Sequence, residues 1–369
     1  MTGRVYFARI GPGNGRENTI TRIRRLFDTA GLASCIDEGD LTAVKLHFGE
    51  EGCDTFVSPV WVRQVVDRVR EAGGNPFLTD TNTLYSGQRD NTVDHIATAI
   101  SHGFGYEVTG APIVIADGLH SQNWREVAID GKHFSKVKIA GDILDAESMI
   151  VVSHMKGHGM AGFGGAIKNL AMGCAPAAGK MDQHQGLVPL IEAGACAECA
   201  TCVRVCPTGA LEGGPGGITL TTTRCIGCGE CMTVCPNGAI DFDWKEGLVP
   251  FMEMMTEYAL GAVQGKEGRV GYINVLTNIT PDCDCCPWSD RPIVPDIGIL
   301  ASKDPVAIDA ASFDLVNAQP GMAESRLIGN REPGADKFRG VNPYSDGMVQ
   351  VRYGEEIGLG SADYELVEI

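Results

Sequence analysis

Two short runs of cysteines in the middle of the chain have the spacing of iron–sulfur ligands. The runs are CAECATCVRVCP and CIGCGECMTVCP, and both follow C-x2-C-x2-C-x3-C-P. This spacing is typical of bacterial two-cluster ferredoxins, in which the fourth cysteine of each run binds the other cluster. We therefore predict two 4Fe–4S clusters that carry single electrons. Cluster I would use Cys196, Cys199, Cys202 and Cys235, and cluster II would use Cys225, Cys228, Cys231 and Cys206.

Structural zinc is the alternative for these runs, because eight thiolates could also hold two tetrahedral zinc ions. Two features favour the ferredoxin interpretation. Both runs end in Cys-Pro, and similar segments, TGALEGG and NGAIDFD, follow the two prolines. The duplication indicates one unit repeated around two clusters.

Six of the fourteen cysteines lie outside these runs. Three of them, Cys283, Cys285 and Cys286, fall within the stretch PDCDCCPW, in a loop that must curl to bring them together. We predict a third iron–sulfur or metal centre there, with Cys174 as its fourth ligand or with one position open to substrate. Redox-active thiols, and buried thiols without chemistry, are the two alternatives.

Polar residues also follow one predicted strand after another. They are Lys45, His47, Asp80, Asn82, Asp117, His154, Lys156, His158, Asn278, Lys303 and Asp304. In an open parallel sheet the carboxyl ends of the strands share one edge, where ligands bind. We therefore expect a crevice lined by these side chains.

The densest of these segments is HMKGHGMAGFGGAIKN, residues 154–169. Its glycines precede a predicted helix, which favours anion binding by backbone N–H groups. We predict a pocket for a small anionic substrate rather than a dinucleotide site, and close packing of the glycines is the alternative. The predicted anion-binding residues are Lys45, His47, Asp80, Gly162, Gly164, Gly165, Lys168 and His184. The predicted catalytic residues are His154, Lys156 and His158, since histidine transfers protons near neutral pH.

The scaffold for these residues follows from the apolar pattern. VYFARI, TAVKLHF and ESMIVVSHMK are typical of strands, and valines at helical spacing within VSPVWVRQVVDRVREAGG predict a helix. Such alternation predicts an α/β fold with a mostly parallel sheet flanked by helices. We expect an α/β domain in two segments, 1–189 and 246–320. Between them lies a small α+β two-cluster ferredoxin-like domain, 190–245, and a C-terminal surface extension covers 321–369.

Five segments together resemble a known family. They are VKLHFGEEG, LTDTNTLY, SHMKGHGMAGFGGAIKNLAMGC, NITPDCDCC and DIGILASKDPVAIDAASFDLV. The resemblance, over roughly residues 1–320, is to uncharacterised iron–sulfur-centre proteins of domain of unknown function family 362, in members with an inserted two-cluster ferredoxin. It implies an electron-transfer role in anaerobic or microaerobic prokaryotes and leaves the substrate open.

Charge and composition narrow the class of protein. The net charge is −17 and the pI is about 4.9, which argues against a nucleic-acid or anionic-membrane partner. The sequence shows no apolar run of about 18 residues and no signal-peptide pattern. We therefore expect a cytoplasmic protein, in which fourteen reduced cysteines serve as metal ligands. The oligomeric state is not indicated.

Two functions fit these patterns. The first is an iron–sulfur oxidoreductase that passes single electrons from a soluble redox protein to a small anion in the crevice. The second is an electron carrier or docking protein without its own substrate, or a scaffold for cluster assembly. A flavin in the crevice is also compatible with the residues found there.

Overall fold

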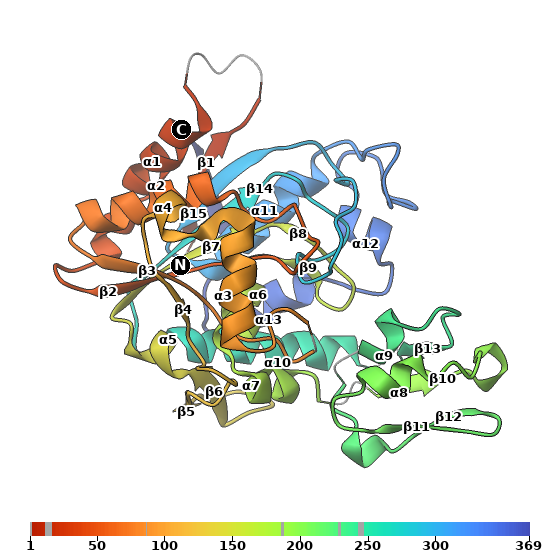
Figure 1. Ribbon diagram of the computed structural model, residues 1–369. Coiled ribbons are helices and arrows are strands. Elements are labelled where there is room, and N and C mark those ends of the chain that lie inside the picture. The colour runs from red at the N-terminus through yellow and green to blue at the C-terminus, as the bar shows by residue number, and fades with distance from the viewer. Residues whose placement is uncertain (1, 12–16, 86, 186–187, 228–229, 243–246) are drawn as a thin grey trace.

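The computed structural model describes residues 2–11, 17–85, 87–185, 188–227, 230–242 and 247–369. Its centre is an eight-stranded sheet with the strand order β16-β1-β15-β14-β7-β2-β3-β4 (Figure 1). The strands are β1 (Gly3–Arg9), β2 (Leu41–Lys45), β3 (Asn75–Asp80), β4 (Ile113–Ile115), β7 (Ser148–His154), β14 (Val270–Leu276), β15 (Gly298–Ser302) and β16 (Tyr364–Glu368). Strands β14, β7, β2, β3 and β4 pair in parallel, which confirms the predicted α/β fold with a mostly parallel sheet.

Helices cover both faces of this sheet, and each face has its own hydrophobic core. The alternation along β7 shows why. Met149 and Val151 join one core, while Ile150 and Val152 join the other. The helices with residues in the first core are α6 (Ala166–Cys174), α10 (Leu248–Val263), α11 (Pro305–Asn317) and α13 (Met348–Glu356). The second core contains residues of α1 (Thr19–Thr29) and α2 (Pro59–Glu71).

Shorter elements connect these layers. They are α3 (Thr92–Ala99), α4 (Tyr106–Thr109), β5 (Trp124–Ala128), β6 (Lys136–Ala140), α5 (Gly141–Asp145), β8 (Lys156–His158), β9 (Gly162–Gly164), α7 (Ala177–Gln183) and α12 (Lys337–Val341). The glycine-rich segment after β7 therefore forms a hairpin, β8–β9, before α6 begins. It differs from the single turn between a strand and a helix that binds dinucleotides.

The predicted crevice lies at the carboxyl ends of β2, β3, β7 and β14. Strands β2, β3 and β7 end at Lys45, Asp80 and His154, and their parallel pairing brings these ends to one edge. Strand β15 is antiparallel to β14, so Lys303 and Asp304 lie at the opposite edge. The expectation that these two residues share the crevice is wrong, because an apolar run does not reveal the direction of its strand.

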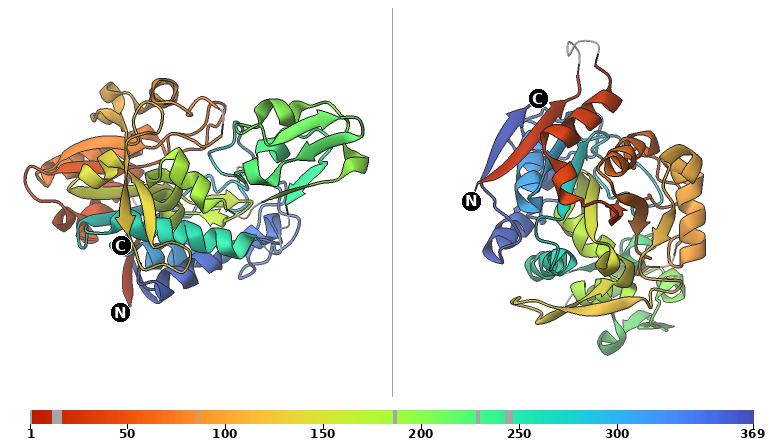
Figure 2. Two further views of the ribbon diagram at one scale, coloured as in Figure 1. Left: turned by 90° about the horizontal axis from the view of Figure 1, so that it is seen from below. Right: turned by 90° about the vertical axis from the view of Figure 1, so that its left-hand side faces the viewer.

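Residues 189–242 form a small substructure that we call the cysteine module. It contains the pairs β10 (Pro189–Ile191) with β13 (Ile240–Phe242) and β11 (Leu211–Gly214) with β12 (Gly217–Leu220), and the helices α8 (Thr201–Val205) and α9 (Glu230–Thr233). Its own hydrophobic cluster is centred on Cys202, Leu211 and Ile240. Figure 2 shows the module projecting to one side of the sheet.

The C-terminal segment differs from the predicted surface extension. Helix α13 contacts α10 and α11, and β16 pairs in parallel with β1 at the edge of the main sheet. Phe338 and Val351 are at most 1% exposed. The segment is therefore part of the α/β domain, since a few apolar side chains within a polar, glycine-rich stretch complete the core.

Candidate functional site

The cysteine loop after β14 is a tight turn. The Cys286 N–H donates to the Cys283 carbonyl at 2.9 Å and closes it. A Cβ at Gly157 would collide with the Pro281 carbonyl oxygen, so the β8–β9 hairpin can pack directly against the loop. The Gly157 N–H also donates to the Thr280 carbonyl at 2.8 Å. The loop curls as the sequence predicts.

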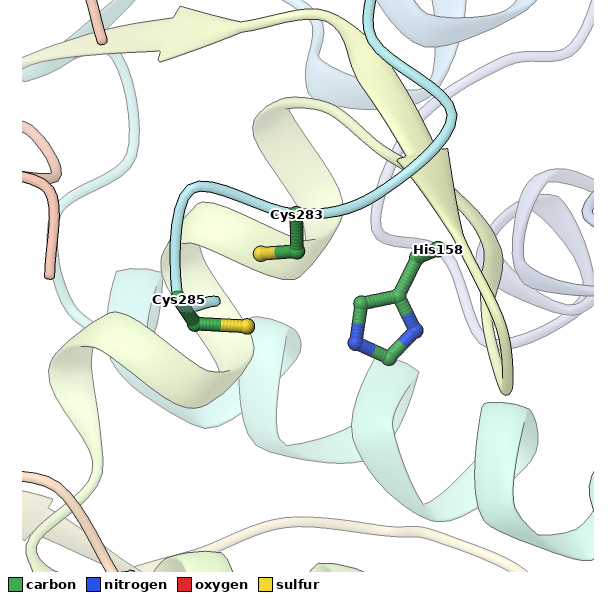
Figure 3. Close-up of side chains that lie close together, drawn as sticks. All are labelled: His158, Cys283 and Cys285. Carbon is green, nitrogen blue, oxygen red and sulfur yellow. The ribbon is translucent and has the colours of Figure 1, made fainter. Parts of the chain in front are cut away.

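Two of these cysteines face a histidine of the hairpin. One ligand atom each from His158, Cys283 and Cys285 lies within 4.8 Å of the other two (Figure 3). Cys283 is buried, and the other two are half-buried. Two thiolates and an imidazole could hold a soft or borderline metal ion such as zinc or iron. We call these three residues the thiol site.

The environment of the thiol site changes its acid–base behaviour. The hydrogen bond with Cys285 and burial raise the pKa of Cys283 well above the usual value of a thiol. Burial and nearby Lys168 lower the pKa of His158 well below its usual value. The His158 Nδ1 atom accepts hydrogen bonds from the N–H groups of Met160, at 3.2 Å, and Ala161, at 3.0 Å. These contacts fix the orientation of the imidazole ring.

Two lysines place positive charge beside the thiols. Lys168 Nζ lies 3.6 Å from Cys283 Sγ. Lys156 Nζ lies 3.2 Å from Asp284 Oδ2. Burial opposes the charge of Lys156, but Asp284 and Cys283 raise its pKa above the usual value. The predicted residues Lys156, His158 and Lys168 are thus brought together, and they surround the cysteine loop.

His154 has a different role from the predicted one. Its Nδ1 atom lies 2.9 Å from Asp284 Oδ2, and its Nε2 atom donates to the Thr277 carbonyl at 2.8 Å. Burial opposes ionisation of Asp284, but His154 and Lys156 hold its pKa well below the usual value. Both ring nitrogens of His154 are engaged, so it anchors Asp284 and is not free to transfer protons to a substrate.

The predicted anion ligands on β2 and β3 also bind each other. Lys45 Nζ donates to Asp80 Oδ1 at 3.0 Å, to Asn169 Oδ1 at 2.7 Å and to the Leu46 carbonyl at 2.9 Å. The side chain of Lys45 is fully buried. All three protons of its ammonium group are used, so Lys45 and Asp80 form an internal ion pair and not a substrate contact.

His47 is held in the same internal network. Its Nδ1 atom accepts from the Gly49 N–H at 2.9 Å, and its Nε2 atom lies 3.2 Å from Arg89 Nη1. Arg89 Nε donates to Glu50 Oε2 at 3.0 Å, and both side chains are buried. Arg89 escaped the sequence analysis because it lies in the polar stretch SGQRDN, which follows no strand pattern.

The glycines before α6 serve close packing. A Cβ at Gly165 would collide with the Asp309 carboxylate, and one at Gly162 with the backbone of Gly347. Asp309 accepts from the Ala166 N–H at 2.7 Å and the Ile167 N–H at 2.9 Å. The start of α6 is therefore capped by the protein's own carboxylate.

Gly164 adjoins the stems of Lys156 and Lys168, where a Cβ would contact both. Anion binding by the amides of Gly162, Gly164 and Gly165 stays a prediction.

His184 ends α7, just before the cysteine module. Its Nδ1 atom donates to the Lys180 carbonyl at 2.6 Å, and its ring packs beside Phe251. Burial lowers the pKa of His184 to about 4.

Cys174 and Cys286 are not part of the close group. Cys174 ends α6 six residues after Lys168, about 9 Å further along the helix axis. It is fully buried, and burial raises its pKa to about 11. Cys286 follows Cys285 in the turn, and its thiol is not in the close group. The predicted set of four cysteines is therefore replaced by His158 with Cys283 and Cys285.

The cysteines of the module surround two cavities. Cys196, Cys199, Cys202 and Cys235 line one, and Cys206, Cys225 and Cys231 line the other. The empty volumes are about 350 and 340 Å³, open solvent included. Cys228 lies outside the described residues. The described cysteines thus divide between the cavities in the two sets that the spacing predicts, and none forms a disulfide.

Two proteins among those to which this chain is similar illustrate the comparisons. A stretch of 156 residues is 26% identical to the thylakoid-associated protein sll1697 of Synechocystis sp. and covers 41% of this chain and 43% of that protein. The match therefore spans less than half of that relative. The fold is similar to the lactate racemase apoprotein from Thermoanaerobacterium thermosaccharolyticum, with a TM-score of 0.40 and 12% identity over 75% of this chain and 51% of that one.

The family assignment is firmer. The model of one family matches residues 42–314, which include the crevice, the thiol site and the cysteine module. The chain belongs to the family described as Domain of unknown function (DUF362).

Proposed function

We propose that this protein is an iron–sulfur electron-transfer protein that delivers electrons to a small anionic substrate at the thiol site. The observation that carries the proposal is the arrangement of the module cysteines around two cavities of similar size. Two 4Fe–4S clusters held there would supply one-electron transfer. Cys196, Cys199, Cys202 and Cys235 would hold one cluster, and Cys206, Cys225, Cys228 and Cys231 the other.

The spacing of these thiols favours clusters over zinc. In a tetrahedral site with a Zn–S bond of about 2.3 Å, the sulfurs lie about 3.8 Å apart. Among the described cysteines of the module, no three have sulfur atoms within 4.8 Å of one another. A cubane of irons and sulfides holds its four thiolates further apart than one ion does. The wider arrangement therefore suits a cluster.

Hydrogen bonds to sulfur give further support. The Ala210 N–H donates to Cys206 Sγ at 3.2 Å, and the Ala239 N–H donates to Cys235 Sγ at 3.2 Å. Both donors stand four residues after the last cysteine of a run. Such bonds stabilise anionic thiolates and are one of the means by which proteins tune cluster potentials.

A contact of Met232 links the module to the α/β domain. Met232, next to Cys231 in the sequence, packs against both the module cluster and the main core. This contact supports an electron path between the two parts of the molecule.

The charge around the thiol site suits an anion. Lys156 and Lys168 adjoin Gly164 and the cysteine loop. Only one carboxylate, Asp284, is paired with them in the described structure, and it is already bound by His154. A soluble redox protein would donate or accept electrons at the module.

An electron carrier without its own substrate is the second candidate function. The internal pairing of Lys45 with Asp80 favours it. This pair and His47 were predicted to bind substrate, but they are held by contacts within the protein. A cluster scaffold would instead release its clusters to an apo-ferredoxin.

Reoxidation kinetics distinguish the first two functions. We expect some members of a panel of small anions to accelerate the reoxidation of the dithionite-reduced protein under anaerobic conditions. Lys168→Met should slow this step on the order of tenfold, because it removes the positive charge beside Cys283. The matched control is Lys136→Met, which removes an exposed lysine paired with Glu126. If no anion accelerates reoxidation, the protein is a carrier.

A further inference from the structure

The thiol site has a feature that a metal site would lack. A histidine that binds a metal through one ring nitrogen normally donates its other N–H to a carbonyl or a carboxylate. Here the His158 Nδ1 atom faces two backbone N–H donors, those of Met160 and Ala161. Nδ1 must therefore be the acceptor, and in the neutral ring Nε2 carries the proton.

This proton points toward sulfur. Figure 3 shows the outer edge of the His158 ring turned to the side chains of Cys283 and Cys285. With its proton in place, Nε2 has no lone pair to offer a metal ion, but it can donate a hydrogen bond to a thiolate. Lys168, with its Nζ atom 3.6 Å from Cys283 Sγ, adds a positive charge. Both groups can donate a hydrogen bond to a sulfur atom of the pair.

The turn also brings the two sulfurs together. Their sulfur atoms lie within 4.8 Å of each other. Cys283 and Cys285 are two residues apart in a closed turn, where Cα atoms lie within the range of about 4.4–6.8 Å that a disulfide spans. Gly157 and Gly52 pack against either end of the loop, at Pro281 and Pro287. The pair is thus held in place by close backbone contacts.

We propose that Cys283 and Cys285 form a redox-active dithiol–disulfide pair, with His158 and Lys168 as the polar groups that face its sulfur atoms. Reduction breaks the sulfur–sulfur bond, consumes two electrons and two protons, and yields two thiols. The reductant is a pair of one-electron donors of the iron–sulfur class, and the protons come from water. The inference rests on the proposed function for its electron source.

Such a pair would convert single electrons into a two-electron transfer. In the reverse direction one thiolate attacks an anionic disulfide, and the second thiolate then releases the mixed disulfide. That exchange closes the Cys283–Cys285 bond and leaves two small thiols. The substrate class is therefore an anionic disulfide, which Lys156 and Lys168 would attract.

Peptide mapping tests the pair directly. No trypsin site except the resistant Arg291–Pro292 bond lies within residues 270–303, so one tryptic peptide carries Cys283, Cys285 and Cys286 and no other cysteine. We expect it to take one alkyl group after mild oxidation of the protein with diamide and three after reduction with dithionite. The readout does not depend on activity.

Three variants locate the bond. Cys283→Ser and Cys285→Ser should each prevent its formation, whereas Cys286→Ser should retain it. His158→Ala should slow its reduction on the order of 10²-fold, as expected for loss of a proton donor. A bond that requires Cys286 would overturn the proposal. A bound metal ion would also overturn it. In that case the thiols would resist diamide, and the protein would hold one metal ion per chain that His158→Ala loses.

The two proposals can fail separately. If dithiothreitol reduces the pair but dithionite does not in a protein with full clusters, the electron path to the thiol site is wrong and the disulfide stands. If the clusters are present and no disulfide forms, the present inference fails alone.

Discussion

Asp284 carries the charge balance of the thiol site. Its carboxylate is 1% exposed and is shared between His154 Nδ1 and Lys156 Nζ. A buried charge is tolerated only when it is paired and hydrogen-bonded. This single side chain therefore holds a strand-end histidine and a hairpin lysine against the cysteine loop.

Asp284→Asn should destabilise the protein by about 3–5 kcal/mol, because it leaves the buried charge of Lys156 without its partner. Urea unfolding at pH 7 measures the change. The matched control is Glu365→Gln at the exposed pair with Arg4, where a cost below about 1 kcal/mol is expected. Equal costs in the two variants would show that Asp284 is not the anchor.

Single residues were predicted unevenly. The spacing of the module cysteines predicted two sets of four, each with its fourth member from the other run, and the cysteine loop was expected to curl. The predicted partner of that loop was wrong, because Cys174 was expected beside it and His158 is found there. Spacing along the chain reports local ligand sets, whereas the hairpin that brings His158 over the loop depends on tertiary packing against Pro281.

At the scale of elements, α6 connects α11 with the cysteine loop. Its start is capped by Asp309 from α11, and Lys168 in its first turns reaches Cys283. Asn274 of β14 also donates to Asp309, at 2.8 Å. One carboxylate thus ties a helix, a strand and a second helix together, and it fixes the direction from which Lys168 approaches.

The Asp309 cap at the start of α6 predicts that the stability of the protein depends on pH. Burial raises the pKa of Asp309 to about 6, from 3.8 in an exposed carboxyl group. The folded state then binds more protons than the unfolded state between about pH 4 and 6, so the contribution of Asp309 is full below this window and is lost as the pH rises through it. The change is roughly 3 kcal/mol.

Asp309→Asn removes the titrating group, so the difference in free energy of unfolding between wild type and variant should decrease from pH 4 to pH 6. Urea titrations at intervals of pH measure it. If the free energies of unfolding of wild type and variant differ by a constant amount from pH 4 to pH 6, the role of Asp309 is contradicted.

The elements themselves were largely predictable. Alternating apolar patterns identified the strands and helices of both cores. The direction of β15 and the place of α13 and β16 were not, because an apolar pattern gives burial but neither strand direction nor partner. The pattern also missed the hairpin β8–β9, whose glycines were expected in a turn before a helix.

At the scale of the whole molecule, the chain joins an α/β domain and a cysteine module in one polypeptide. Across the described residues no helix is long and apolar enough to cross a membrane. We propose that the net charge of −17 favours a redox partner with a basic face. The module cysteines and the predicted crevice residues occupy separate segments of the sequence.

The central claim is that the module cysteines hold two iron–sulfur clusters. Iron, acid-labile sulfide and zinc counted on the protein purified without oxygen test it most directly. The account predicts about eight iron atoms and about eight sulfides per chain, as in two 4Fe–4S clusters, without stoichiometric zinc. About two zinc ions per chain, with little iron or sulfide, would contradict it.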